Sequence, residues 1–152
     1  VPYRAVYVRF IDKVVSSATI HMDSHPGFFR HSHYVACGKV LLAYGSEITR
    51  DNYVRNVPFS SMTRHSIPSA KELLVELETI KKRGYAIDNE ESEYGLICVA
   101  APVLSHNGQA IAAISISGPS SRMLENMEKN IAIVTETGKA ITEKLGSLAS
   151  PD

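Results

Sequence analysis

The chain has 152 residues, of which 44% are hydrophobic and 21% charged, and its sixteen basic and sixteen acidic residues cancel. This composition is typical of one soluble globular domain with its own core, and it lacks the basic excess of a nucleic-acid-binding module. No apolar run is long enough to cross a bilayer and no signal peptide opens the sequence, so we expect no membrane partner.

The two cysteines, Cys37 and Cys98, follow neither a CxxC pattern nor a zinc-ribbon spacing. Two thiols in a chain of this length are typical of a reducing compartment rather than of a disulfide-stabilised fold. We therefore expect a cytoplasmic protein without a metal or other cofactor.

Residues 5–22 predict a β-hairpin. Residues 5–11 are rich in β-branched and aromatic side chains, and residues 14–22 return after a short polar turn. Residues 23–35 are expected to form a long loop, because Pro26-Gly27 interrupts regular structure.

Four histidines lie in this part of the chain, and imidazole is a common metal ligand. Their spacing fits no metal-binding motif, so we prefer surface and loop histidines to a zinc site, which remains the less favoured alternative. The residues are His21, His25, His31 and His33.

Residues 36–44 predict a helix that follows this loop. The amides in the first turn of a helix are unpaired and carry partial positive charge, so an anion could bind near Ala36 and Cys37. Gly38 would let the backbone come close to a ligand, although this segment taken alone favours a glycine selected for tight helix packing.

Three further helices are expected. Residues 47–57 form a short one before Pro58, and residues 70–83 form an amphipathic one that begins at the capping residue Ser69 and ends at Gly84. The last helix covers residues 120–148, with an apolar stripe that packs on the sheet or on a partner subunit.

A short strand at residues 85–88 is followed by an acidic loop at residues 89–93. Glu90 and Glu91 in this loop are interpreted as a solvated turn, because paired-carboxylate catalysis has no other support in the sequence.

A second hairpin joins residues 96–104 to residues 110–117. Asn107-Gly108 lies between them and favours a two-residue type I′ turn. That register places Ala100 opposite Ser115 and Cys98 opposite Ser117, with all four side chains on one sheet face. This face is either a floor for a small polar ligand or a solvent-exposed surface. Together these elements predict an α+β fold of the GAF/PAS type, with an antiparallel sheet flanked by helices.

Four segments, in their order and spacing, resemble the C-terminal effector-binding domain of isocitrate-lyase-regulator (IclR) type bacterial transcription factors. Together they cover most of the chain. They are Ala36–Ala43, Lys82–Glu91, Gly95–Val103 and Ala112–Pro119, followed by Arg122.

The resemblance implies a GAF-like sensor domain over residues 1–152 that is not an enzyme. It implies a pocket for a small organic acid (an oxo-, hydroxy- or aromatic carboxylate), a homodimer or homotetramer, and DNA binding only through an N-terminal winged helix-turn-helix outside this sequence. By position, the effector-binding residues would be Ala36, Cys37, Asp88, Cys98, Ser115 and Ser117.

Two departures from the family leave an alternative open. A small residue often stands where Cys37 does, and residues 28–33 are unusually rich in aromatic and histidine side chains that would line or cover the pocket. The alternative is a thiol-based redox or zinc-binding GAF-like sensor or enzyme that uses Cys37 and Cys98.

Overall fold

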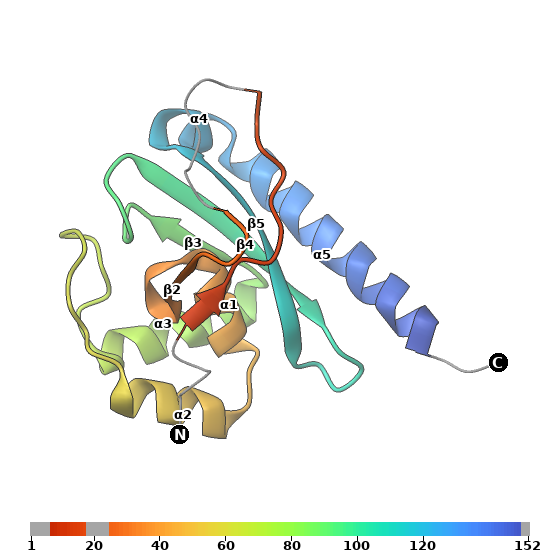
Figure 1. Ribbon diagram of the computed structural model, residues 1–152, viewed down its shortest axis with the longest axis horizontal. Helices are drawn as coiled ribbons and strands as arrows, with labels where there is room; N and C mark the ends of the chain where they lie inside the picture. The colour runs from red at the N-terminus through yellow and green to blue at the C-terminus, as the bar shows by residue number, and fades with distance from the viewer. Residues whose placement is uncertain (1–6, 18–24, 150–152) are drawn as a thin grey trace.

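The computed structural model describes residues 7–17 and 25–149. Its centre is a three-stranded antiparallel sheet in the order β3-β4-β5, formed by β3 (Ala86–Asn89), β4 (Leu96–Leu104) and β5 (Ala110–Pro119). Helix α1 (Ala36–Ala43) packs on one face and helix α5 (Met127–Ala149) on the other (Figure 1). The predicted α+β class, an antiparallel sheet flanked by helices, is confirmed.

The alternation of side chains along β4 separates two cores. Cys98 and Ala100 belong to the cluster that includes α1, whereas Ile97, Val99 and Ala101 belong to the cluster that includes α5. A central strand covered by helices on both faces is expected to be apolar along its whole length, as this one is.

Gly138, which interrupts the apolar stripe of α5, has a packing role. A Cβ atom built there would lie 2.7 Å from the carbonyl oxygen of Pro102 in β4. The missing side chain therefore lets α5 lie directly against the sheet.

Helix α3 (Ala70–Arg83) packs against α1 through Leu73, Leu77 and Ile80, all buried in the same core. Its predicted ends are confirmed, because the Ser69 hydroxyl accepts a hydrogen bond from the amide of Glu72 and Gly84 has a φ of 87°. Helix α2 (Glu47–Asn56) begins in the same way at Ser46.

The predicted pairing of residues 5–11 with residues 14–22 in an N-terminal hairpin is wrong. Strand β1 (Tyr7–Arg9) pairs antiparallel with β2 (Phe29–His31), inside the segment expected to be a loop. Residues 14–17 form no strand, and residues 18–22 lie outside the described residues, as does His21. Both candidate partners have strand-like composition, so only the tertiary contacts decide between them.

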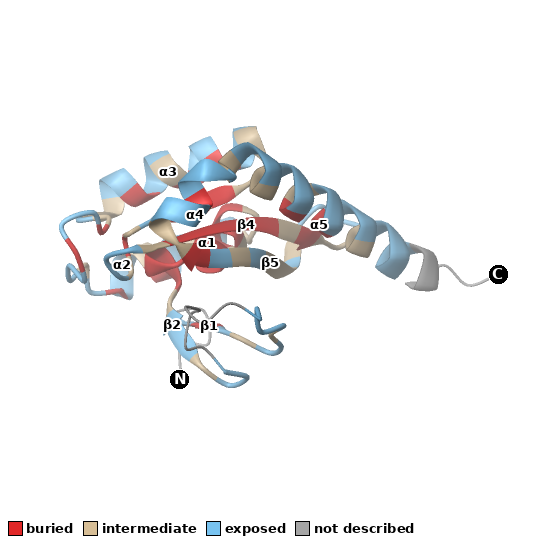
Figure 2. Cartoon of the chain, turned by 90° about the horizontal axis from the view of Figure 1, so that it is seen from above, coloured by how far each residue is buried: buried red, intermediate tan, exposed pale blue. Residues whose placement is uncertain are grey.

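The β1–β2 sheet is separate from the main sheet and lies on the side away from α5 (Figure 2). A 3-10 helix, η1 (Ser32–Tyr34), connects it to α1. The N-terminal segment is therefore attached to the core next to the first turn of α1.

The helix predicted for residues 120–148 is divided in two. Helix α4 (Ser120–Glu125) ends at Asn126, whose φ of −115° and ψ of 21° are not helical. The carbonyl of Asn126 accepts from the amide of Asn130, so α5 starts directly after it. Asparagine is common at such boundaries because it adopts non-helical backbone conformations easily.

The register of the β4–β5 hairpin is confirmed, with Cys98 opposite Ser117 and Ala100 opposite Ser115, but the turn is not type I′. A type I′ turn requires a positive φ at Asn107. Among the described residues, Glu90 is the only non-glycine residue with a positive φ, so Asn107 does not meet this requirement.

The turn contains three residues, because the amide of Ser105 donates to the carbonyl of Gln109. A bulge at Ile111 then shifts the pairing by one residue, between Leu104–Ala110 and Val103–Ala112. This bulge restores the register that the sequence predicted from a two-residue turn.

Candidate functional site

All six residues expected to bind the effector are located on the α1 side of the sheet. Ala36 and Cys37 begin α1, and the other four are contributed by the three strands. We call Cys98, Ala100, Ser115 and Ser117 the floor residues. Cys98 and Ala100 are buried, whereas Ser115 and Ser117 are exposed, so the floor is covered over β4 and open over β5.

The two thiols lie beside the two hydroxyls. The Cys37 side chain interacts with Ser115, and the Cys98 side chain with Ser117. Burial raises the pKa of Cys37 to about 11 and that of Cys98 to about 12. Both thiols are therefore protonated at neutral pH, whereas thiol redox chemistry and zinc ligation use the thiolate.

Asp88 is fully buried opposite Cys98 on β3. Its Oδ1 accepts from the amides of Glu91 (2.8 Å) and Ser92 (3.3 Å), and its Oδ2 accepts from the Ser92 hydroxyl (2.6 Å). Burial raises its pKa, and these donors partly offset that effect. The carboxyl group thus holds the loop after β3 in place next to the floor residues.

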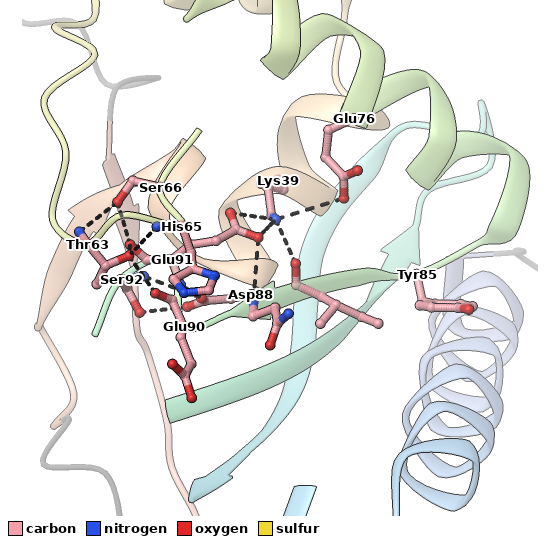
Figure 3. A network of polar contacts seen from close by, with 12 residues as sticks. Lys39, Thr63, His65, Ser66, Glu76, Tyr85, Asp88, Glu90, Glu91 and Ser92 are labelled. Carbon is pink, nitrogen blue, oxygen red and sulfur yellow. Dashed lines mark hydrogen bonds and ion pairs between the residues drawn. The ribbon is translucent and has the colours of Figure 1, made fainter. Parts of the chain in front are cut away.

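Sequence reasoning missed the main charged group of the site, the buried ammonium of Lys39 (Figure 3). Its Nζ donates to the carbonyl of Ile87 at 2.6 Å and to both carboxylate oxygens of Glu91 at 2.6 and 2.8 Å. Glu76 on α3 is 3.8 Å away. One signal could have indicated this buried ammonium. Lys39 stands within the apolar segment after Gly38, and a buried ammonium requires a partner.

The prediction of a solvated acidic loop is therefore wrong. Glu91 is buried and paired with Lys39, and the side chain of Glu90 accepts a hydrogen bond from the Ser120 hydroxyl. This network joins α1, the β3 loop and α4, and it neutralises the Lys39 charge within the protein.

Gly38 is explained by packing. A Cβ atom built there would overlap the backbone of Ser32 in η1. The residue before α1, Val35, offers no side-chain acceptor, so the first-turn amides near Ala36 and Cys37 are not capped by a side chain.

His33 is fully buried, contrary to the preference for surface and loop histidines, whereas His25 is exposed. The Nδ1 atom of His33 is 2.6 Å from the Tyr53 hydroxyl, and burial lowers its pKa to about 4. Within residues 7–17 and 25–149, no group of three histidine, cysteine or acidic side chains is placed to hold a metal ion.

Two clefts border this region, and the second of them includes one floor residue. One, of about 450 Å³, lies between α3, β3 and the start of α5 and includes Glu76 and Glu91. The other, of about 380 Å³, follows β5 and includes Ser117 and Arg122. In the part of the chain that the structure describes, no helix is both long and apolar enough to span a membrane.

An antiparallel sheet with helices on both faces and a small polar floor under a helix start defines the GAF-like class of α+β domain. The family model for the C-terminal domain of the bacterial transcriptional regulator IclR matches residues 4–143, so the chain belongs to this family. The family is one of transcriptional regulators and not of enzymes.

Known proteins agree with this assignment. The HTH-type transcriptional regulator KdgR of Dickeya chrysanthemi is 36% identical over 138 residues, which are 90% of this chain and 45% of that protein. The crystal structure of Thermotoga maritima IclR superposes with a TM-score of 0.87 at 36% identity, covering 93% of this chain and 58% of that one.

The inducer-binding domain of PobR from Acinetobacter, solved as a complex of a double mutant with 3-hydroxybenzoic acid, has a TM-score of 0.70 at 23% identity. It covers 78% of this chain and 69% of that one, and at this identity it shows the shared fold alone. The chain spans about half the length of the curated relatives it matches.

Proposed function

We propose that this domain binds a small organic acid between the start of α1 and the floor residues. One observation carries the proposal: two exposed hydroxyls and two protonated thiols lie on the sheet face that α1 begins to cover. Polar groups clustered at the uncovered end of an otherwise apolar surface are typical of a small-molecule site.

The uncapped amides at Ala36 and Cys37 and the hydroxyls of Ser115 and Ser117 would donate to the carboxylate. Cys98 would contact the ligand body, and Asp88 would accept from a ligand hydroxyl. A hydrogen bond to a charged group contributes about 1.5–3 kcal/mol, so three or four of them give an affinity of about micromolar after ordering costs.

In the whole protein, ligand binding would change how an N-terminal helix-turn-helix domain binds DNA. The relatives named as HTH-type regulators and the length of those relatives support this proposal. The regulator would act in the cytoplasm as a homodimer or homotetramer, and the ligand would bias its subunit arrangement through different affinities for the two states.

The test is a thermal-shift screen of the chain against oxo-, hydroxy- and aromatic carboxylates. The parent is compared with Ser115→Ala/Ser117→Ala and with Ser121→Ala, an exposed serine on α4 that serves as the control. The proposal is supported if an acid stabilises the parent and the Ser121→Ala control but not the double variant. A shift by zinc or oxidant that needs both cysteines, with none by any acid, would overturn it.

A further inference from the structure

The β1–β2 sheet has one face toward the core. Val8 and Arg30 are directly opposite each other in its register, so their side chains share a face. Val8 is 6% exposed and belongs to the core cluster that includes Cys37 and Cys98. Arg30 therefore lies on the face of the β1–β2 sheet whose Val8 packs on the core beside α1, although the Arg30 side chain itself is exposed.

The Phe28 ring lies beside Arg30, and the Phe10 ring lies next to Phe28. The amide of Phe10 donates to the carbonyl of Phe28 at 2.9 Å, their rings are 6.0 Å apart, and Phe10 packs against the same core cluster. The guanidinium carbon of Arg30 is 4.3 Å from the centroid of the Phe28 ring. Stacking of this kind orients a guanidinium and leaves the N–H groups at its edge available for an acceptor.

The charge of Arg30 is not neutralised by any carboxylate among the described residues. The buried cation at the start of α1, Lys39, is already paired with Glu91. The thiols and hydroxyls of the floor residues carry no charge at neutral pH, and Asp88 is held by three donors of its own loop. Arg30 is thus an exposed guanidinium on the face of the β1–β2 sheet that it shares with Val8, with no carboxylate partner among the described residues.

We infer that the effector carries two anionic groups, one bound at the start of α1 and the second bound by Arg30, with its carbon chain lying against Phe28. The inference rests on the proposed function and specifies its ligand class as a dicarboxylate. A guanidinium binds a carboxylate through two parallel hydrogen bonds, which a neutral methyl group at the same position cannot accept.

The experiment compares ligands that differ in one carboxylate alone. Binding of succinate and butyrate, glutarate and pentanoate, and terephthalate and 4-methylbenzoate is measured by isothermal titration calorimetry on the 152-residue chain. The variants are Arg30→Gln, Arg30→Lys and Arg9→Gln. Arg9 is the matched control, because it is exposed on the same strand pair but on the other face.

We expect the parent to bind at least one dicarboxylate about tenfold or more tightly than its monocarboxylate partner. Arg30→Gln should lower the ratio of dicarboxylate to monocarboxylate affinity to about one, and Arg30→Lys should lower it less. Arg9→Gln should leave the ratio unchanged. Circular dichroism checks that each variant is folded.

The remaining outcomes separate the two proposals. Equal binding of both members of every pair, or a ratio that Arg30→Gln leaves unchanged, would overturn the dicarboxylate inference while the organic-acid site stands. If Arg30→Gln and Arg9→Gln reduce the preference for dicarboxylates equally, the preference comes from the overall charge of the protein. That outcome would also overturn the dicarboxylate inference. If no acid of either kind binds, the proposed function itself falls.

Discussion

The ammonium of Lys39 lies 2.6 Å from Glu91 Oε1, and the two residues are 52 positions apart in the sequence. The lysine side chain has no solvent exposure and that of Glu91 is 11% exposed. The pair connects the helix that begins at the proposed binding site to the loop after β3, so its loss should affect the whole domain.

Lys39→Met should destabilise the domain by about 3 kcal/mol, because it leaves a buried carboxylate without its partner. Urea unfolding followed by circular dichroism measures the change. Lys81→Met, at an exposed position near the end of α3, is the control and should cost less than about 0.5 kcal/mol.

Adding Glu91→Leu to Lys39→Met should recover much of the loss, since the second change removes the unpaired group. A loss from Lys39→Met below about 1 kcal/mol, the size typical of a surface ion pair, would contradict the buried geometry.

Lowering the pH from about 6.5 toward 4 should remove the stability that the buried, neutral His33 contributes to the domain. Its pKa is 6.5 in the unfolded chain and about 4 in the folded state, so the unfolded state binds more protons in this window. The full effect of this group is about 3 kcal/mol. Buried Asp88 and Glu91, whose pKa values are raised, contribute in the opposite direction.

Urea unfolding of the parent and of His33→Gln at several pH values isolates the contribution of His33 to stability, because a glutamine side chain does not titrate. The variant should lose less stability between pH 6.5 and 4 than the parent does, and the exposed control His25→Gln should follow the parent. Parallel curves for the parent and His33→Gln would show that His33 does not titrate as its burial requires.

Gly38→Ala should destabilise the domain by about 2 kcal/mol or more, because its Cβ would overlap the backbone of η1 and neither element can move freely. The comparison is Gly146→Ala in α5, where a Cβ meets no atom within 4 Å. That change should be stabilising by about 0.5 kcal/mol, since alanine favours helix over glycine. Thermal unfolding ranks the two variants, and equal melting temperatures would refute the close approach.

Cys37 and Cys98 should react slowly with a thiol reagent such as DTNB, because both are buried and their pKa values are raised. The rate measured spectrophotometrically in buffer should be about a hundredfold below the rate in urea, where both thiols are exposed. Fast modification of either thiol in the folded protein would return the redox alternative to consideration.

Local patterns predicted most of the regular structure and part of the site. Helix α3 was predictable from Ser69 to Gly84 because caps and a 3.6-residue apolar period act within one segment. The pairing of Cys98 with Ser117 was predicted by counting outward from a turn at Asn107-Gly108, and side-chain alternation then placed the pair on one face with Ala100 and Ser115. Even the wrong turn type did not change that pairing, since the bulge at Ile111 compensates for the extra turn residue.

The sequence by itself therefore determined the order of elements, most of their ends and the side chains that share the floor. Only the tertiary structure decided that β1 pairs with β2, that Lys39 and Glu91 form a buried pair and that His33 loses contact with water. These features depend on the desolvation of charged and polar groups by segments far apart in the chain. Their free energies are set by burial and by partners, and neither is encoded in the residues next to them.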